Sequence, residues 1–116
     1  MTDPDIQREI QLLRVAYCRK LPRELTRLGT LLAEARDTHE EQQLDAARRL
    51  AHMLRGSSGS YGFAEVSAEL RRIEEHLDRA LEGESPVSEG VWEEIEDALS
   101  AAGARLDRDR GGGSLA

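Results

Sequence analysis

The chain has 116 residues, enough for one domain with a modest core and too few for a second independent core. Its formal net charge is −7, and its basic residues form no run longer than a pair, which argues against nucleic acid or an anionic membrane surface as a partner. Apolar residues make up 39% of the chain and aromatic residues 3%, so the core must be aliphatic, which favours helices packed on helices.

A single cysteine, Cys18, excludes an internal disulfide, so the chain has no need of an oxidising compartment. No stretch approaches the roughly 20 apolar residues of a membrane span. The acidic N-terminus lacks the pattern of a signal peptide. We therefore expect a cytoplasmic location.

Apolar residues recur at helical spacing almost from end to end of the chain. A short stripe over residues 6–17 predicts a first helix. A longer stripe over residues 21–35 predicts a second helix, with Pro22 near its start, where a missing backbone N–H costs nothing.

The third predicted helix has the clearest boundaries. Thr38 and Glu41 fit the capping box S/T-x-x-E, in which the two side chains satisfy free N–H groups, so we expect this helix to begin near residue 39. Its apolar stripe runs from Leu44 to Tyr61, and Gly62 is the expected break.

Two further helices complete the pattern, one over residues 63–81 and one over residues 92–106, with a Gly-Glu-Ser-Pro loop at 83–86 between them. We predict an all-α fold, an antiparallel four-helix bundle with an additional short N-terminal helix, over residues 1–108. Residues 109–116 are expected to form a flexible Gly-rich tail or linker.

The most unusual segment lies within the third helix. Three glycines and three serines fall between residues 56 and 62, and each glycine costs about 1 kcal/mol relative to alanine in a helix interior, so helix stability did not select them. On a helical wheel Leu50, Leu54 and Tyr61 point into the bundle, whereas His52 points outward. The same outer face carries Asp45, Arg48, Arg49, Arg55, Gly56 and Gly59.

This arrangement suits phosphoryl transfer to the imidazole of His52. An exposed imidazole can keep a nucleophilic nitrogen near neutral pH. Gly56 and Gly59 leave room for the surface of another protein, and Arg55 can pair with phosphoryl oxygens. Such transfer needs little beyond positioning and charge compensation, and the partner would supply the aspartate and Mg²⁺. An isolated exposed histidine, by contrast, is usually only a solvated surface residue.

The remaining polar residues of interest receive structural interpretations. Ser57 and Ser58 point sideways or inward, and we interpret them as small packing residues whose hydroxyls bond back to the preceding turn. His39 lies in the capping segment. His76 lies among acidic residues on what we interpret as a solvated face rather than a metal site, because adjacent helix positions do not share a face. Its acidic neighbours are Glu74, Glu75 and Asp78.

The segment from His52 to Gly62 resembles the signature of histidine-containing phosphotransfer (Hpt) domains. That signature commonly reads His-x-Leu-Lys-Gly-Ser-Ser, with a further glycine ten residues past the histidine, and this chain reads His-Met-Leu-Arg-Gly-Ser-Ser. The resemblance covers roughly residues 6–107. It implies a four-helix bundle in which His52 is the phosphoacceptor, Arg55 replaces the usual lysine that steadies the phosphoryl group, and Gly56 admits the partner.

The resemblance also implies a phosphocarrier of a two-component phosphorelay rather than an enzyme, with no autokinase activity and no cofactor or metal of its own. Its expected partners are receiver domains of response regulators, which would hold Mg²⁺, and a sensor or hybrid histidine kinase. Complementary charge around the site would set the choice of partner. The residues expected to contact partners are Asp45, Arg48, Arg49, Gly56 and Gly59. We expect a monomer, because no further apolar stripe remains once the bundle is assembled.

Two other functions stay open at the level of sequence. A passive helical adaptor could dock receivers through the bare glycine surface without phosphate, and His52→Ala would then keep binding and function. The chain could also be the phosphoacceptor domain of a chemotaxis-type kinase, with a kinase core further along a longer chain. The Ser57-Ser58 pair favours a relay domain over this last reading.

Overall fold

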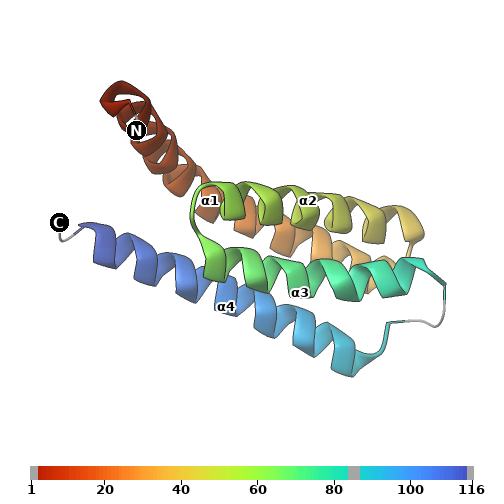
Figure 1. Ribbon diagram of the computed structural model, residues 1–116. Coiled ribbons are helices and arrows are strands. Elements are labelled where there is room, and N and C mark those ends of the chain that lie inside the picture. The colour runs from red at the N-terminus through yellow and green to blue at the C-terminus, as the bar shows by residue number, and fades with distance from the viewer. Residues whose placement is uncertain (1–2, 84–86, 115–116) are drawn as a thin grey trace.

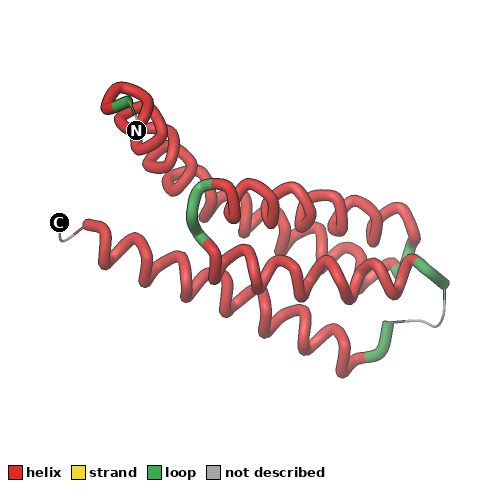
Figure 2. The backbone as a smooth tube through the Cα atoms, viewed as in Figure 1, coloured by secondary structure: helices red, strands yellow, loops and turns green. Residues whose placement is uncertain are grey.

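The computed structural model describes residues 3–83 and 87–114. Within these ranges it contains four helices and no strand. The helices are α1 (Pro4–Thr38), α2 (Glu41–Ser60), α3 (Ala64–Leu81) and α4 (Glu89–Ser114). Successive helices run antiparallel and contact each other, and α1 also contacts α4, which closes the bundle (Figure 1). Only short connections separate α1 from α2 and α2 from α3 (Figure 2). The predicted all-α bundle is confirmed.

The core consists mainly of leucine, isoleucine and alanine at helical spacing, and its largest buried side chains are Trp92 and Phe63. Fully burying one such large apolar side chain stabilises the fold by about 1.5–3 kcal/mol. In α2 the buried residues are Leu44, Ala47, Leu50, Ala51, Leu54 and Ser58. Since this stripe faces the core, the opposite side of α2 must face outward. None of the helices in the described part of the chain is long and apolar enough to cross a membrane.

The first helix corrects the prediction of a separate short N-terminal helix. α1 is one continuous helix, because the apolar spacing passes from Tyr17 to Leu21 by four residues with no break between them. Pro22 therefore lies inside a helix rather than at its start. Because proline cannot donate the hydrogen bond of a helix interior, it accounts for the angle at which the first part of α1 leaves the bundle (Figure 1).

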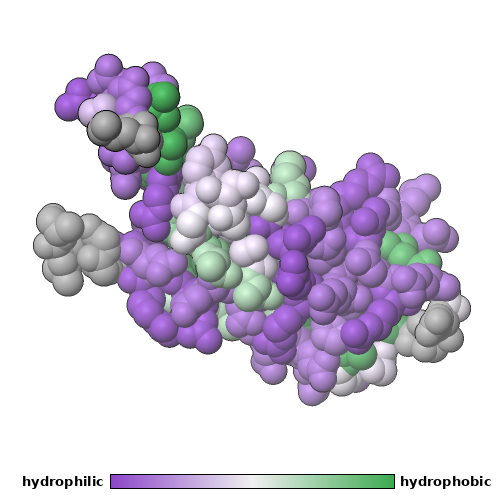
Figure 3. Space-filling model, viewed as in Figure 1, coloured by the Kyte–Doolittle hydropathy of each residue, from purple (hydrophilic) through white to green (hydrophobic). Residues whose placement is uncertain are grey.

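The projecting first part of α1 carries hydrophobic side chains gathered on one side, as Figure 3 shows. Its exposed large hydrophobic residues are Ile6, Ile10, Leu12, Leu13 and Val15. The expectation that no apolar stripe remains outside the bundle is therefore wrong, because it assumed that every apolar stripe packs on the core. The expected monomer stays a prediction without that support.

The predicted capping box is also not formed. Thr38 is the last residue of α1, and its hydroxyl accepts a hydrogen bond from the N–H of Glu40 at 3.2 Å instead of capping the next helix. The chain reverses at His39, which has a left-handed φ of 55° and donates its N–H to the carbonyl of Ala35 at 2.9 Å. The prediction was wrong because residue 38 still belongs to the preceding helix.

The other helix ends follow the sequence more closely. Gly62 lies in the turn that follows the end of α2. Its φ is +86°, a left-handed conformation that favours glycine. α4 continues to Ser114, beyond the helix end expected at residue 106 and into the flexible tail expected from residue 109, because the glycines weaken a helix but keep their N–H groups. Of the predicted loop and tail, residues 84–86 and 115–116 lie outside the described residues.

Candidate functional site

The outward side of α2 carries His52, as predicted. Leu50 and Leu54 on the opposite side are buried in the core, while the His52 side chain is 58% exposed. Arg49 is exposed and Arg55 is half-buried on the same outer side. The helix therefore presents an imidazole at the surface from a position that core packing fixes.

A carboxylate from α3 holds the imidazole from one side. One carboxylate oxygen of Glu74, Oε2, lies 2.7 Å from Nδ1 of His52, and the other, Oε1, lies 2.6 Å from Nε of Arg55. The Glu74 side chain is only 12% exposed. Burial by itself would raise the pKa of Glu74, but the hydrogen bonds from His52 and Arg55 outweigh it and lower that pKa. Glu74 is therefore a shielded carboxylate that accepts from both neighbours.

Two groups compete for Nδ1 of His52. Nη2 of Arg55, which can only donate, lies 3.2 Å from this atom, whereas the carboxylate of Glu74, which can only accept, lies at 2.7 Å. The shorter contact to the shielded carboxylate prevails, so we assign the proton of the neutral ring to Nδ1. The lone pair then lies on Nε2, in a side chain that is open to solvent.

Arg55 is fixed beside His52 by two contacts with α3. Its Nε donates to Glu74, and its backbone carbonyl accepts a hydrogen bond from the hydroxyl of Ser67 at 2.8 Å. A guanidinium has five N–H donors, so Arg55 retains donors for an anion at the imidazole while it stays bound to Glu74. The arrangement gives the site a cation of fixed position.

The two glycines on the outer side of α2 differ in their surroundings. A Cβ added at Gly56 would meet no atom within 4 Å, so the fold does not require glycine there. A Cβ at Gly59 would lie 3.4 Å from Oγ of Ser67, an ordinary contact with α3. Gly56, one turn after His52, therefore leaves a bare surface that the packing of the bundle does not explain.

The serine pair is divided between surface and core. Ser58 is fully buried, and its Oγ lies 3.0 Å from the hydroxyl of Tyr17 on α1. Its inward direction is confirmed, but its hydroxyl bonds to Tyr17 rather than to the preceding turn. Burial raises the pKa of Tyr17, so this hydroxyl stays protonated and holds α1 against α2. Ser57 is half-buried.

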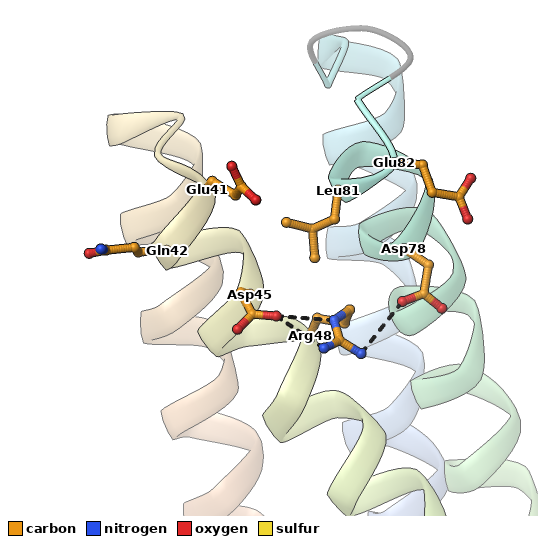
Figure 4. Close-up of a pocket in the computed structure, with 7 residues that line it drawn as sticks. All are labelled: Glu41, Gln42, Asp45, Arg48, Asp78, Leu81 and Glu82. Carbon is orange, nitrogen blue, oxygen red and sulfur yellow. Dashed lines mark hydrogen bonds and ion pairs between the residues drawn. The ribbon is translucent and has the colours of Figure 1, made fainter.

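A separate group of ion pairs lies one to two turns before His52. Asp45 contacts Arg48 at 3.0 Å and Arg49 at 2.6 Å, and hydrogen bonds from these arginines lower its pKa. Arg48 also reaches Asp78 of α3 at 3.8 Å, as Figure 4 shows. These charges compensate one another at one side of a pocket of ≈ 630 Å³. The pocket is lined by Glu41, Gln42, Asp45, Arg48, Asp78, Leu81 and Glu82.

The interpretation of His76 as part of a solvated face is wrong. Its side chain is 15% exposed, and its Nε2 lies 3.0 Å from Oε2 of Glu94. The sequence neighbours of His76 did not reveal this contact, because α4 packs on α3 and brings Glu94 from a distant part of the chain. Over the part of the chain that the structure describes, no group of three or more His, Cys, Asp or Glu residues could hold a metal ion.

An exposed imidazole with a shielded carboxylate and a fixed arginine is thus built on a helical bundle. Comparison with known protein families matches the Hpt domain over residues 12–105. The chain belongs to the Hpt domain family. Hpt domains serve histidine phosphotransfer in two-component signalling, as phosphocarriers rather than enzymes, and they interact with receiver domains and kinases. No curated protein and no solved structure matches the chain.

The residue of this Hpt domain that sequence reasoning missed as part of the site is Glu74. The sequence alone placed it in an acidic face around His76. Ser67, Glu74 and Asp78 are spaced so that they share one side of α3, and all three contact α2. That spacing is the signal that could have found Glu74, but which side of α3 meets α2 is decided by packing.

Proposed function

We propose that this Hpt domain accepts a phosphoryl group on Nε2 of His52 from the phosphorylated aspartate of a receiver domain, and passes it on to another such aspartate. The observation that carries the proposal is the 2.7 Å contact between Nδ1 of His52 and Glu74. Because this contact uses Nδ1, it leaves Nε2 as the nucleophile on the open side of the ring.

The proposed transfer balances without a proton leaving the ring. The bond from phosphorus to the aspartate oxygen breaks as a bond forms from phosphorus to Nε2 of His52, and the aspartate leaves as a carboxylate. The ring becomes positively charged, and Glu74, which keeps its hydrogen bond to Nδ1–H, compensates that charge. Arg55 offers its remaining donors to the phosphoryl oxygens. The receiver supplies Mg²⁺ and the aspartate.

We also propose the partners of this domain and its location in the cell. Receiver domains would approach over the bare surface at Gly56, and a sensor or hybrid kinase would stand upstream of them in the relay. The ion pairs of Asp45 with Arg48 and Arg49 would lie towards one edge of the contact and contribute to partner choice. The domain would need no cofactor of its own and would act in the cytoplasm.

A panel of receiver domains phosphorylated with labelled phosphate tests the proposal. We expect label on the wild type and on His76→Gln that is labile in acid and stable in alkali, and no label on His52→Gln. His76→Gln is the matched control, since it also removes one imidazole paired with a glutamate. If receivers bind all three proteins and label never moves, the passive adaptor is correct. Label on His52→Gln would move the site to His39 or His76.

A further inference from the structure

The arginines on the α2 side of the site are already held by carboxylates of the same chain. Arg48 and Arg49 contact Asp45, and Arg55 contacts Glu74. Their charges are therefore largely compensated before a partner arrives. A receiver brings a phosphoryl group on an aspartate together with the carboxylates that hold Mg²⁺. Such an anionic surface is attracted most strongly by a cation that has no counterion of its own.

Arg71 of α3 occupies the position where such a cation would be useful. Ser67, Glu74 and Asp78 lie along the side of α3 that contacts α2. Arg71 is four residues after Ser67 and three before Glu74, so it lies on the same side of the helix, between the contacts made by these two residues. It therefore stands across from the segment of α2 that contains the bare surface at Gly56.

Arg71 differs from its neighbour Arg72 in both direction and pairing. Both residues are exposed. Arg72 donates to Glu69 at 2.8 Å, whereas Arg71 makes no ion pair or side-chain hydrogen bond with residues 3–83 and 87–110. Successive helix positions are about 100° apart, so Arg72 points away from the side that contacts α2. Among the described side chains, these adjacent positions thus carry one arginine with an ion pair and one without.

We infer that Arg71, which makes no ion pair within the described part of the chain, is a cation that this domain presents to the carboxylate-rich phosphorylation site of the receiver. This inference rests on the proposed function of His52. Arg71 accelerates the encounter and orients the receiver over Gly56, while Arg55 remains with Glu74 beside the imidazole. Arg71 is thus a docking residue that sets partner preference for acidic surfaces, and it takes no part in the bond exchange.

The test measures transfer from one phosphorylated receiver at several receiver concentrations and at low and high ionic strength. The variants are Arg71→Ala, Arg71→Lys and, as the matched control, Arg72→Ala, which removes the same charge from the same helix. We expect Arg71→Ala to lower the second-order rate constant by about three- to tenfold at low salt, with a smaller difference at high salt. The rate of Arg71→Ala at saturating receiver should equal that of the wild type. Arg71→Lys should keep most of the wild-type second-order rate constant, and Arg72→Ala should transfer as the wild type does.

Equal transfer by Arg71→Ala and Arg72→Ala would overturn the inference and leave the role of His52 intact. A loss in the saturating rate that does not respond to salt would also overturn it, because it would place Arg71 in the chemistry or the fold. If no label reaches the wild type, the proposed function fails, and the affinity of each variant for the receiver is then measured by titration. Equal affinities of Arg71→Ala and Arg72→Ala would refute the role of Arg71. A loss of affinity in Arg71→Ala alone would support it.

Discussion

Two histidine–glutamate pairs involve α3, and they are built in opposite ways. At the candidate site the histidine is 58% exposed and Glu74 is 12% exposed, whereas in the second pair His76 is 15% exposed and Glu94 is 58% exposed. The atom in contact also differs, because His52 uses Nδ1 and His76 uses Nε2. A carboxylate contact is therefore common to both pairs. What distinguishes His52 is that its second nitrogen remains open to a partner.

The carboxylates of the two pairs differ as well. The second oxygen of Glu74 is bound by Arg55, so this carboxylate has two donors and a fixed orientation. Within the described residues, His76 is the only side chain that pairs with Glu94. A carboxylate fixed in this way can hold one tautomer of the ring, and an exposed one with a single partner cannot do so as well. The comparison thus predicts unequal consequences when each glutamate is removed.

Among variants that keep His52, the largest effect is expected when Glu74 is replaced. Glu74→Ala removes the acceptor of the Nδ1 proton and leaves Arg55 half-buried without its counterion, so we expect phosphoryl transfer to slow by about 10- to 100-fold. Glu74→Gln keeps an acceptor oxygen and should lose less. The control is Glu94→Ala, for which we expect a rate within about twofold of the wild type, since its pair lies outside the chemistry. Transfer of label from a phosphorylated receiver measures all three rates. Equal losses of rate in Glu74→Ala and Glu94→Ala would contradict a special role for the pair of His52 and Glu74.

An intermediate effect is expected at the bare surface beside the exposed pair. Gly56→Gln places a side chain where a receiver would approach, and we expect transfer to slow severalfold. The fold should not suffer, because a Cβ there meets no atom within 4 Å, and replacing glycine in a helix stabilises it by about 0.5–1 kcal/mol. Rate and thermal unfolding are measured on the same samples.

The matched control for this surface is Gly103→Gln on α4, where an added Cβ also meets nothing within 4 Å. It should gain similar stability while transfer remains at the wild-type rate. If Gly56→Gln transfers as fast as Gly103→Gln, the open surface at Gly56 is not where the partner docks.

Sequence reasoning succeeded where a single helix carried the information. The alternation of buried Leu50 and Leu54 with exposed His52 depends on α2 alone. The burial of these residues in the structure agrees with the prediction from helical spacing. Glu74 was missed because its role depends on how α2 and α3 are aligned against each other. Glu94 was missed for the same reason, since only the packing of α4 brings it to His76.

Local signals also misled where two interpretations fit the same residues. Pro22 suits the first turn of a helix, but the apolar spacing through Tyr17 and Leu21 carries α1 across it. Thr38 suits an N-cap, yet it ends α1 and leaves α2 to begin at Glu41. In each case the local preference is worth a few kcal/mol at most, and packing of the longer apolar stripe outweighs it.

The smallest expected effect is on stability in acid, and it again separates the two kinds of pair. The pKa of Glu74 is lowered in the fold because hydrogen bonds from His52 and Arg55 outweigh its burial. Between this lowered pKa and the ordinary value of about 4.3, the unfolded chain binds a proton that the folded chain does not, so stability rises with pH. The contribution of Glu74 to stability is therefore complete above the ordinary pKa and is lost as pH falls through the folded pKa.

Chemical unfolding followed from pH 6 to pH 3 should show a shallower loss of stability in Glu74→Gln than in the wild type. Asp45, whose pKa is also lowered, leaves part of the slope in place. Glu75→Gln, which removes an exposed carboxylate at the next position, should keep the wild-type slope, and a slope equally reduced in both variants would mean that Glu74 is not held by its two neighbours.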